Sequence, residues 1–390
     1  MVVRGVRCFE KGQTMNREQG VARRRACPLS QWGRGQGEGA VLWSRGPLEF
    51  TTPPGGVLAG TGGSKCSTTF PLTPALSPSG GEGVARWLLW CWLIVAPAFA
   101  LSAQEFAFTE QADRLVLTHA AKPVAHFVFR DTKILRPYFA HVHTPDGIQV
   151  TRTHPPVVGK DAVDHDTMHP GVWLAFGDLG GNDFWRNKAV VRHERFTAAP
   201  TVKAGQLTFA MESSLLATNQ TKLATMNARC VVSRVGAGFL LSWEASFTPT
   251  SDGFYFGDQE EMGLGVRVAT ELTEKKGGVI TSSSGATTAK GTWGKSANWC
   301  DYSGVLGERR VGIAVFAATE NFRPSWFHNR DYGLMVANPF GDNAFTKGAK
   351  SRVPVAKGEP FRLRFGAWIH STAKGGLADV DGAWEQFRKP

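Results

Sequence analysis

GFLLSWEASF (238–247) and FRLRFGAWIH (361–370) are the two stretches that decide the fold. In both, apolar and polar residues alternate, and this period of two is typical of a strand with one buried face. Working outward, the same pattern recurs in RLVLTH (114–119), LTFAMES (207–213) and VGIAVFAA (311–318), each bounded by turn-forming residues. At least about ten such strands without alternating helices predict an all-β fold, a sandwich of two packed antiparallel sheets.

One short helix is predicted at the C-terminal end, from Leu377 to Phe387. Its apolar residues recur at helical spacing on one face, which we expect to pack against the sandwich; they are Val380, Ala383, Trp384 and Phe387. Neither an internal repeat nor a linker interrupts the strand pattern. We therefore interpret residues 104–390 as one β-sandwich domain.

The N-terminal region differs in composition from this domain. Residues 1–83 mix Gly, Pro, Ser and Arg without periodicity, which predicts a disordered or spurious extension, and Val84 is the candidate true start. Residues 84–103 carry one Arg, an apolar run and then small residues such as Ala98 and Ala100, the pattern of a signal peptide. Because the run is shorter than the roughly 20 residues of a bilayer span, we expect an exported protein, periplasmic or extracellular, with no membrane span in the mature protein. A membrane anchor is the alternative.

Charge and cysteine content exclude some partners. The net charge of +11 suggests a nucleic acid partner. However, residues 1–103 hold 11 Lys+Arg and 5 Asp+Glu, so the domain keeps 33 Lys+Arg and 28 Asp+Glu. These show no basic stripe with interleaved aromatic residues, and we expect no nucleic acid partner. Cys230 and Cys300 are the two cysteines after residue 103; they either form a disulfide or stay as two buried thiols.

The histidines cluster. All ten follow residue 118, and His141 and His143 in RPYFAHVHTPDG would point to one face of a strand, the spacing that two ligands of one metal need. His165 lies in the loop DHDTMHPG and could reach the same point, so these three are candidate ligands of one divalent metal ion. His169, in the same loop, is a candidate catalytic acid. The alternative is that these imidazoles only hydrogen-bond to neighbouring backbone.

Carboxylates, amides and aromatic rings follow in GVWLAFGDLGGNDFW (171–185). Short polar side chains beside aromatic faces match the hydroxyls and apolar ring faces of a sugar. The candidate ligand-binding residues in this stretch are Asp178, Asn182, Asp183 and Trp185, and Arg136 in RPYFAHVHTPDG is a further candidate. The alternative is that Gly-Asp and Gly-Asn pairs are turn chemistry and that the Trp rings lie in the core.

Three downstream segments add groups for acid–base chemistry. Glu261 precedes a strand in GDQEEMGLGVRV, and Asp301 lies in ANWCDYSG. His328, Arg330 and Tyr332 alternate in PSWFHNRDYGLMVANPFG and would share one face of an extended segment. We predict Glu261 or Asp301 as the base and His169 or His328 as the acid, with Arg330 and Tyr332 as ligand-binding groups. A buried structural arginine network is the competing interpretation.

Taken in order, RPYFAHVHTPDG, DHDTMHPGVWLAFGDLGGNDFW, WCDYSG and WFHNRDYGLMVANPFG resemble a bacterial family described as PmoA-like, or methane oxygenase PmoA, over residues of about 105–385. The resemblance implies a sugar-mutarotase-like β-supersandwich and carbohydrate chemistry outside the cytoplasm. It implies no roles for individual residues. The segment DHDTMHP has Asp166, Thr167 and Met168 where the family is expected to be richer in histidine, which weakens a multi-histidine metal centre.

These features predict a secreted carbohydrate-active protein that binds a sugar or 3-keto-sugar and cleaves or isomerises it by general acid–base chemistry. Two alternatives remain at this point. One is an oxidoreductase that depends on copper or another divalent metal, as the family name suggests. The other is a non-catalytic carbohydrate-binding module.

Overall fold

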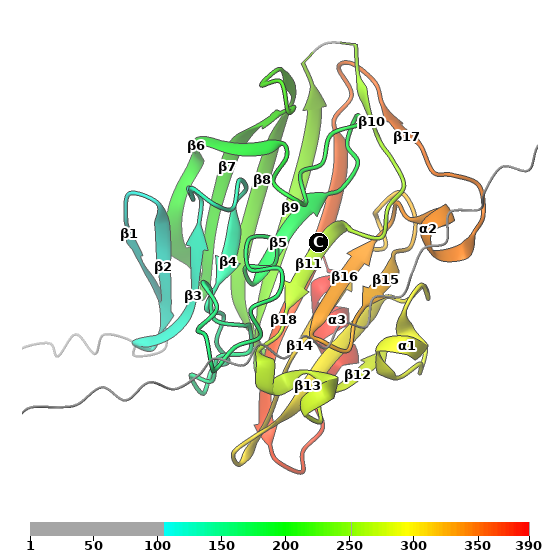
Figure 1. Ribbon diagram of the computed structural model, residues 1–390. Coiled ribbons are helices and arrows are strands. Elements are labelled where there is room, and N and C mark those ends of the chain that lie inside the picture. The colour runs from blue at the N-terminus through cyan, green and yellow to red at the C-terminus, as the bar shows by residue number, and fades with distance from the viewer. Residues whose placement is uncertain (1–104, 251, 390) are drawn as a thin grey trace, which may run out of the picture. The chain divides into compact units, whose positions relative to one another are not determined.

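The computed structural model describes residues 105–250 and 252–389, in which two eight-stranded antiparallel sheets pack face to face (Figure 1). The first sheet has the order β1 (Phe106–Glu110), β2 (Arg114–His119), β3 (Lys122–Val128), β4 (Tyr138–Ala140), β5 (Val172–Phe176), β11 (Met262–Arg267), β16 (Leu334–Asn338) and β15 (Trp326–Asn329). The second has the order β12 (Val279–Ser282), β13 (Trp299–Leu306), β14 (Arg309–Ala317), β18 (Phe361–Ala373), β9 (Gly238–Pro249), β8 (Lys222–Val235), β7 (Gln206–Leu216) and β6 (Val190–Lys203). Strands β10 (Phe254–Phe256) and β17 (Val353–Val355) pair separately. The predicted fold class is confirmed.

The core between the sheets comes from the alternation seen in the sequence. Along β9, inward residues such as Trp243 are buried and the residues between them are partly exposed. The Trp243 ring centroid lies 6.1 Å from that of Phe127 and 5.6 Å from that of Phe139, both in the first sheet. Each such ring removed from water contributes about 1.5–3 kcal/mol. These contacts fix the packing of the two sheets.

The outer face of the first sheet is also covered at its centre. Strands β5, β11 and β16 are buried along their whole length, because loops lie over the face turned away from the core. Trp173, Leu334 and Val336 form a cluster there with Trp185 and Met168 from the covering loops. This second apolar layer is the floor on which the polar residues of the loops are placed.

The C-terminal helix is shorter than predicted. Helix α3 runs from Val380 to Phe387, because the Asp379 carboxylate accepts a hydrogen bond from the Gly382 amide at 2.8 Å and so caps the helix, while Leu377 is 89% exposed and lies outside it. The predicted apolar face packs on the second sheet. The prediction of a single helix was incomplete: there are also α1 (Thr288–Thr292), α2 (Asp342–Thr346) and the 3₁₀ turns η1 (Thr270–Leu272) and η2 (Glu274–Lys276). These are too short to show a helical period.

Both cysteines after residue 103 are buried and unbonded, so the disulfide alternative is not realised. Burial raises the pKa of the Cys230 thiol well above its usual value. None of the helices in residues 105–250 and 252–389 is long and apolar enough to cross a membrane. The predicted N-terminal extension and signal peptide lie outside the described residues.

Candidate functional site

Polar side chains gather on the outer face of the first sheet where β11, β16 and β15 lie side by side (Figure 1). Leu264, Met335 and Phe327 point into the core. By alternation, Arg267 and His328 point outward instead. The predicted His328 therefore stands on this face, near the loops that precede β11 and follow β15.

Glu260, His328 and Arg330 meet at a single carboxylate oxygen. Glu260 Oε2 lies 3.1 Å from His328 Nδ1 and accepts a hydrogen bond from Arg330 Nη2 at 2.8 Å. Trp293 Nε1 lies 3.3 Å from the same His328 nitrogen, and its ring lies 5.9 Å from the Arg330 guanidinium carbon. We call Glu260, His328, Arg330 and Trp293 the Glu260 centre.

The protonation states in this centre follow from burial and hydrogen bonding. The hydrogen bond from His328 holds the pKa of the Glu260 carboxyl below its usual value, helped by the charges of His328 and Arg330. Burial lowers the pKa of the His328 imidazole, and Glu260 offsets this only in part. At neutral pH the pair is a carboxylate beside a neutral imidazole. One Nδ1 cannot both donate to Glu260 and accept from Trp293, and the shorter contact to the charged oxygen favours donation to Glu260.

A hollow of about 560 Å³ adjoins this centre. Its lining combines charged groups, an amide and an indole ring: Glu274, Thr288, Ala289, Lys290, Trp293, Asn329, Arg330 and Asp331. The Tyr302 hydroxyl accepts a hydrogen bond from the Glu274 amide at 2.7 Å and donates to the Asp331 carbonyl at 3.1 Å, which ties two sides of the hollow together. The hollow offers both charge and an aromatic face to a small polar molecule.

A second polar cluster lies next to the Glu260 centre. Arg267 donates two hydrogen bonds to Asp164, at 2.8 and 2.7 Å, and its guanidinium carbon lies 4.7 Å from the centre of the Tyr332 ring. The His165 ring stacks between those of Tyr332 and His169, with centroids at 5.7 and 4.8 Å. Burial opposes ionisation of Asp164, but the hydrogen bonds from Arg267 and His165 outweigh it and hold its pKa well below the usual value. The predicted His165, His169 and Tyr332 are thus brought together.

Arg136 has a different role from the one predicted. It is 3% exposed, and it donates hydrogen bonds to the carbonyl groups of Met168, Phe184 and Trp185. Burial lowers the pKa of its guanidinium to about 9. The prediction that Arg136 touches a ligand is corrected: it fastens two covering loops to the sheet, because a buried guanidinium needs all its donors satisfied.

Trp185 was predicted to present its ring to a ligand, and this too is corrected. Its side chain is 0% exposed and packs edge-on against Trp173, with ring centroids 5.2 Å apart. Gly265 makes room for it, since a Cβ there would lie 2.7–2.8 Å from both indole rings. The aromatic group that borders the hollow is Trp293 instead.

Glu261, a predicted base, lies beside the centre but is engaged elsewhere. It forms an ion pair with Arg186, which also contacts Asp183 at 3.2 Å. Asp183 in turn accepts hydrogen bonds from the backbone amides of Trp185 and Arg186. Glu261 and Asp183 therefore hold the covering loop. Of the two adjacent glutamates, it is Glu260 that contacts the His328 imidazole.

Asp178 and Asn182 lie in a turn, which is what the alternative interpretation of this stretch predicts. The Asp178 carboxylate accepts a hydrogen bond from the Gly181 amide at 3.0 Å. Asn182 bonds to the Gly180 carbonyl and to the Thr218 amide. Both side chains stabilise local backbone and neither contacts the Glu260 centre.

The predicted metal ligands do not form one site. His141 has a positive φ of 50° after the end of β4, and the His143 ring bonds to the His141 carbonyl rather than sharing a strand face with its side chain. His165 belongs to the separate stack on His169 and Tyr332. Among residues 105–250 and 252–389, no group of three or more His, Cys, Asp or Glu residues is placed to hold a metal ion. The residues present do not fit a resident divalent metal.

Asp301 lies on the second sheet, not on the face that carries the Glu260 centre. Its Oδ1 atom lies 2.8 Å from His370 Nε2, and both side chains are buried. Its position beside Trp299 borders a different hollow, against the start of α3. The prediction that Asp301 and Glu261 belong to one catalytic set is therefore not supported by their placement.

Three residues of the site escaped the sequence prediction: Glu260, Trp293 and Arg267. Glu260 is the immediate neighbour of the predicted Glu261, so the segment was right and the residue within it was not. Arg267 could have been found, since an arginine at the end of an otherwise apolar strand requires a partner. Trp293 carries no local signal, because its contact with His328 joins positions 35 residues apart.

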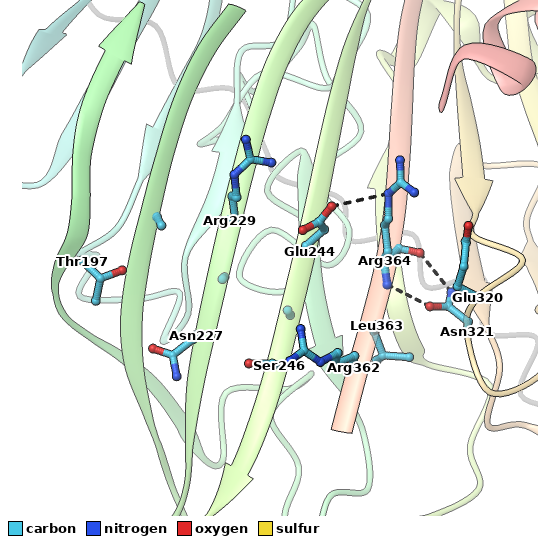
Figure 2. Close-up of a pocket in the computed structure, with 13 residues that line it drawn as sticks. Thr197, Asn227, Arg229, Glu244, Ser246, Glu320, Asn321, Arg362, Leu363 and Arg364 are labelled. Atoms are coloured by element: carbon cyan, nitrogen blue, oxygen red, sulfur yellow. Dashed lines mark hydrogen bonds and ion pairs between the residues drawn. The ribbon is translucent and has the colours of Figure 1, made fainter. Parts of the chain in front are cut away.

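A further hollow of about 360 Å³ lies over the second sheet, as Figure 2 shows. Glu244 and Arg364 form an ion pair there at 3.6 Å, and Arg364 exchanges backbone hydrogen bonds with the Asn321 side chain. Its lining contains no imidazole and no aromatic ring. It offers the carboxylates of Glu244 and Glu320, but no imidazole beside them as in the Glu260 centre.

A family model described as "Family of unknown function (DUF6807)" matches residues 114–385, and this description does not mention PmoA. A galactose mutarotase-like protein from Lactobacillus casei ATCC 334 aligns with 68% of this chain and 100% of its own, at 9% identity and a TM-score of 0.33. A galactose mutarotase related enzyme from Lactobacillus acidophilus aligns with 70% and 99%, at 9% identity and a TM-score of 0.28. No curated protein matches the chain.

Proposed function

This chain belongs to DUF6807, a family of unknown function, and from the geometry of its Glu260 centre we propose that it binds a carbohydrate in the adjoining hollow and acts on it by general acid–base catalysis. The observation that carries the proposal is the meeting of Glu260, His328 and Arg330 on one carboxylate oxygen at the edge of a hollow lined by Trp293. A site of this kind has a base, a proton carrier and a cation within reach of one bound molecule.

Each group has a role that follows from its surroundings. Glu260 is ionised and its side chain is 36% exposed, so it can take a proton from a bound hydroxyl or from a carbon next to a carbonyl. Arg330, with a side chain that is 40% exposed, holds the carboxylate and can polarise a sugar carbonyl. The buried His328 keeps Glu260 oriented and carries a proton to or from it. Cleavage and isomerisation both start from such a proton transfer.

Carbohydrate is the ligand class that best suits the hollow. Lys290, Glu274 and Asn329 offer donors and acceptors for hydroxyl groups, and the Trp293 ring offers an apolar face. A volume of about 560 Å³ accommodates one or two sugar rings.

The test is turnover of a panel of glycosides and 3-keto-glycosides by the purified chain and by Glu260→Gln. We expect the variant to lose about 10²- to 10⁴-fold in kcat, with the Kd for the same sugar changed only a few-fold, because the amide keeps the shape of the carboxylate. Glu308→Gln is the control, since that side chain is 88% exposed. Full turnover by Glu260→Gln would refute the assignment, and sugar binding without turnover by any form would identify a binding module.

A further inference from the structure

Three buried rings beside the Glu260 centre carry nitrogen atoms without partners. His169, Trp173 and Trp185 are each 0% exposed, and their ring centroids lie 5.2–6.1 Å from one another. His169 Nε2, Trp173 Nε1 and Trp185 Nε1 have no hydrogen-bond partner within the described part of the chain. We call these three residues the donor cluster.

All three nitrogens are donors. An indole nitrogen can only donate. For His169, Arg267 Nη1 lies 3.4 Å from Nδ1, and a guanidinium can only donate, so Nδ1 is the acceptor and Nε2 carries the proton. The cluster therefore holds three N–H groups and no acceptor for them. Because a buried donor without a hydrogen-bond partner destabilises the folded state, three such donors in contact call for a common explanation.

The charges around the donor cluster are mostly positive. The Arg136 guanidinium carbon lies 5.8 Å from the centre of the Trp173 ring, and no carboxylate of residues 105–250 or 252–389 lies within ion-pair distance of it. Arg152 and Arg267 share the single carboxylate of Asp164, at 3.9 and 2.7 Å. The carboxylates of Asp161 and Asp166 act on Arg152, and that of Asp183 acts on Arg136, so they offset part of this positive charge. At the cluster itself the cations prevail, because burial and then the three guanidinium groups lower the pKa of the His169 imidazole, and this favours an anion at this point.

A lone unpartnered indole does not make a site. Among the described residues, Trp243 Nε1 also has no partner, yet it lies between the sheets against phenylalanine rings. What distinguishes the donor cluster is the coincidence of three donors, surrounding cations and a position under residues that face solvent. The His165 ring covers His169, and the His165 side chain is 39% exposed.

We propose that the donor cluster is an anion subsite that takes the carboxylate group of a sugar acid, so that the substrate class is acidic rather than neutral carbohydrate. This rests on the proposed function for the sugar ring, which lies toward the Glu260 centre, while the carboxylate enters past the His165 ring. Its two oxygens accept hydrogen bonds from His169 and from the indole groups, and the three arginines compensate its charge.

Calorimetric titration of the full chain tests this with D-glucuronate and D-galacturonate, their parent sugars D-glucose and D-galactose, and acetate. We expect one uronate to bind at least about tenfold more tightly than its parent sugar, because its charged carboxylate gains a hydrogen bond. Trp185→Phe and Trp173→Phe each remove one N–H and keep a ring, and each should reduce this preference by about tenfold. Trp243→Phe is the matched control and should leave it unchanged.

The outcomes separate the two proposals. Equal affinity for a uronate and its parent sugar, or absence of uronate binding, overturns the anion subsite and leaves the proposed function standing. Acetate binding as tightly as the uronates, with no affinity for either neutral sugar, overturns both the sugar-acid assignment and the proposed function. If one tryptophan variant fails to fold, the other variant and the comparison of ligands on the unaltered chain still test the anion subsite.

Discussion

Glu260 and Asp301 are both carboxylates that contact a buried histidine, and their surroundings give them different roles. The Glu260 side chain is 36% exposed and contacts Arg330, which lines a hollow together with Trp293. The Asp301 side chain is 6% exposed, and its partner His370 is fully buried. A buried pair of this kind is costly to break from one side, because the remaining polar group loses both water and its partner.

Asp301→Ala should therefore affect stability rather than chemistry. We expect the free energy of unfolding to fall by about 3–5 kcal/mol, measured by urea denaturation, with turnover per folded molecule unchanged. Asp146→Ala, which removes an exposed partner of Arg309, should cost less than about 1 kcal/mol. A folded Asp301→Ala variant that has normal stability but no turnover would instead place Asp301 in the catalytic set.

His154 makes stability depend on pH. Burial lowers the pKa of its imidazole from 6.5 to about 4 in the folded chain. The unfolded chain thus takes up a proton first as the pH falls, so the free energy of unfolding is unaffected above about pH 6.5 and decreases between about pH 6.5 and 4. After allowance for its partial exposure we expect a loss of about 2 kcal/mol.

The measurement is urea denaturation at pH 7 and pH 5 for the unaltered chain and His154→Gln. The variant should lose less stability between these two pH values, because its side chain does not titrate. His193, whose pKa is also lowered by burial to about 4, should behave in the same way in His193→Gln. A pH dependence that is the same in all three proteins would show that these histidines are not responsible.

At the scale of elements, β11 shows how a strand adapts to the layer that covers it. Its inward residues Leu264 and Val266 belong to the core, and its outward positions 263 and 265 are glycines. Gly265 lies directly under Trp173 and Trp185. The missing side chain is what allows the loop that carries Trp185 to approach the sheet.

Gly265→Ala should disturb this packing. The added Cβ would lie 2.7 Å from Trp173 and 2.8 Å from Trp185, so we expect a loss of about 1–3 kcal/mol in the free energy of unfolding. Gly375→Ala, where a Cβ would meet nothing within 4 Å, should stay within about 0.5 kcal/mol of the unaltered chain. Equal stability of the two variants in urea denaturation would mean that the loop does not rest on Gly265.

The elements were more predictable than the site. Strand alternation identified β2, β7 and β9, because a strand with one buried face alternates apolar and polar residues along the chain. Pattern reasoning also placed the start of α3 at Leu377. The helix begins at Val380 instead, because Asp379 caps it and Leu377 lies outside it. The same reasoning placed the base at Glu261 and not at Glu260. The pairing of β11 and β15 with β16 decides which of these two carboxylates contacts His328, and the local sequence does not show this pairing.

At the scale of the whole molecule, the sandwich brings together segments that are far apart in the chain. Asp164, Arg267 and Tyr332 meet in one cluster, and Glu260, Trp293 and Arg330 meet in the next. Of the polar segments in the sequence, those around His165, Glu261 and His328 meet on the first sheet. His141 and His143 lie apart from them, and the segment around Asp301 belongs to the second sheet.

The most direct test of this account is hydrogen–deuterium exchange of the chain with and without a sugar or sugar acid that binds it. We expect slower exchange on binding in residues 257–262, 288–293 and 326–333, because these segments form the Glu260 centre and its hollow. Slower exchange confined to residues 227–229, 244–246 and 362–364 would place the ligand in the other hollow, over the second sheet, and would contradict the account.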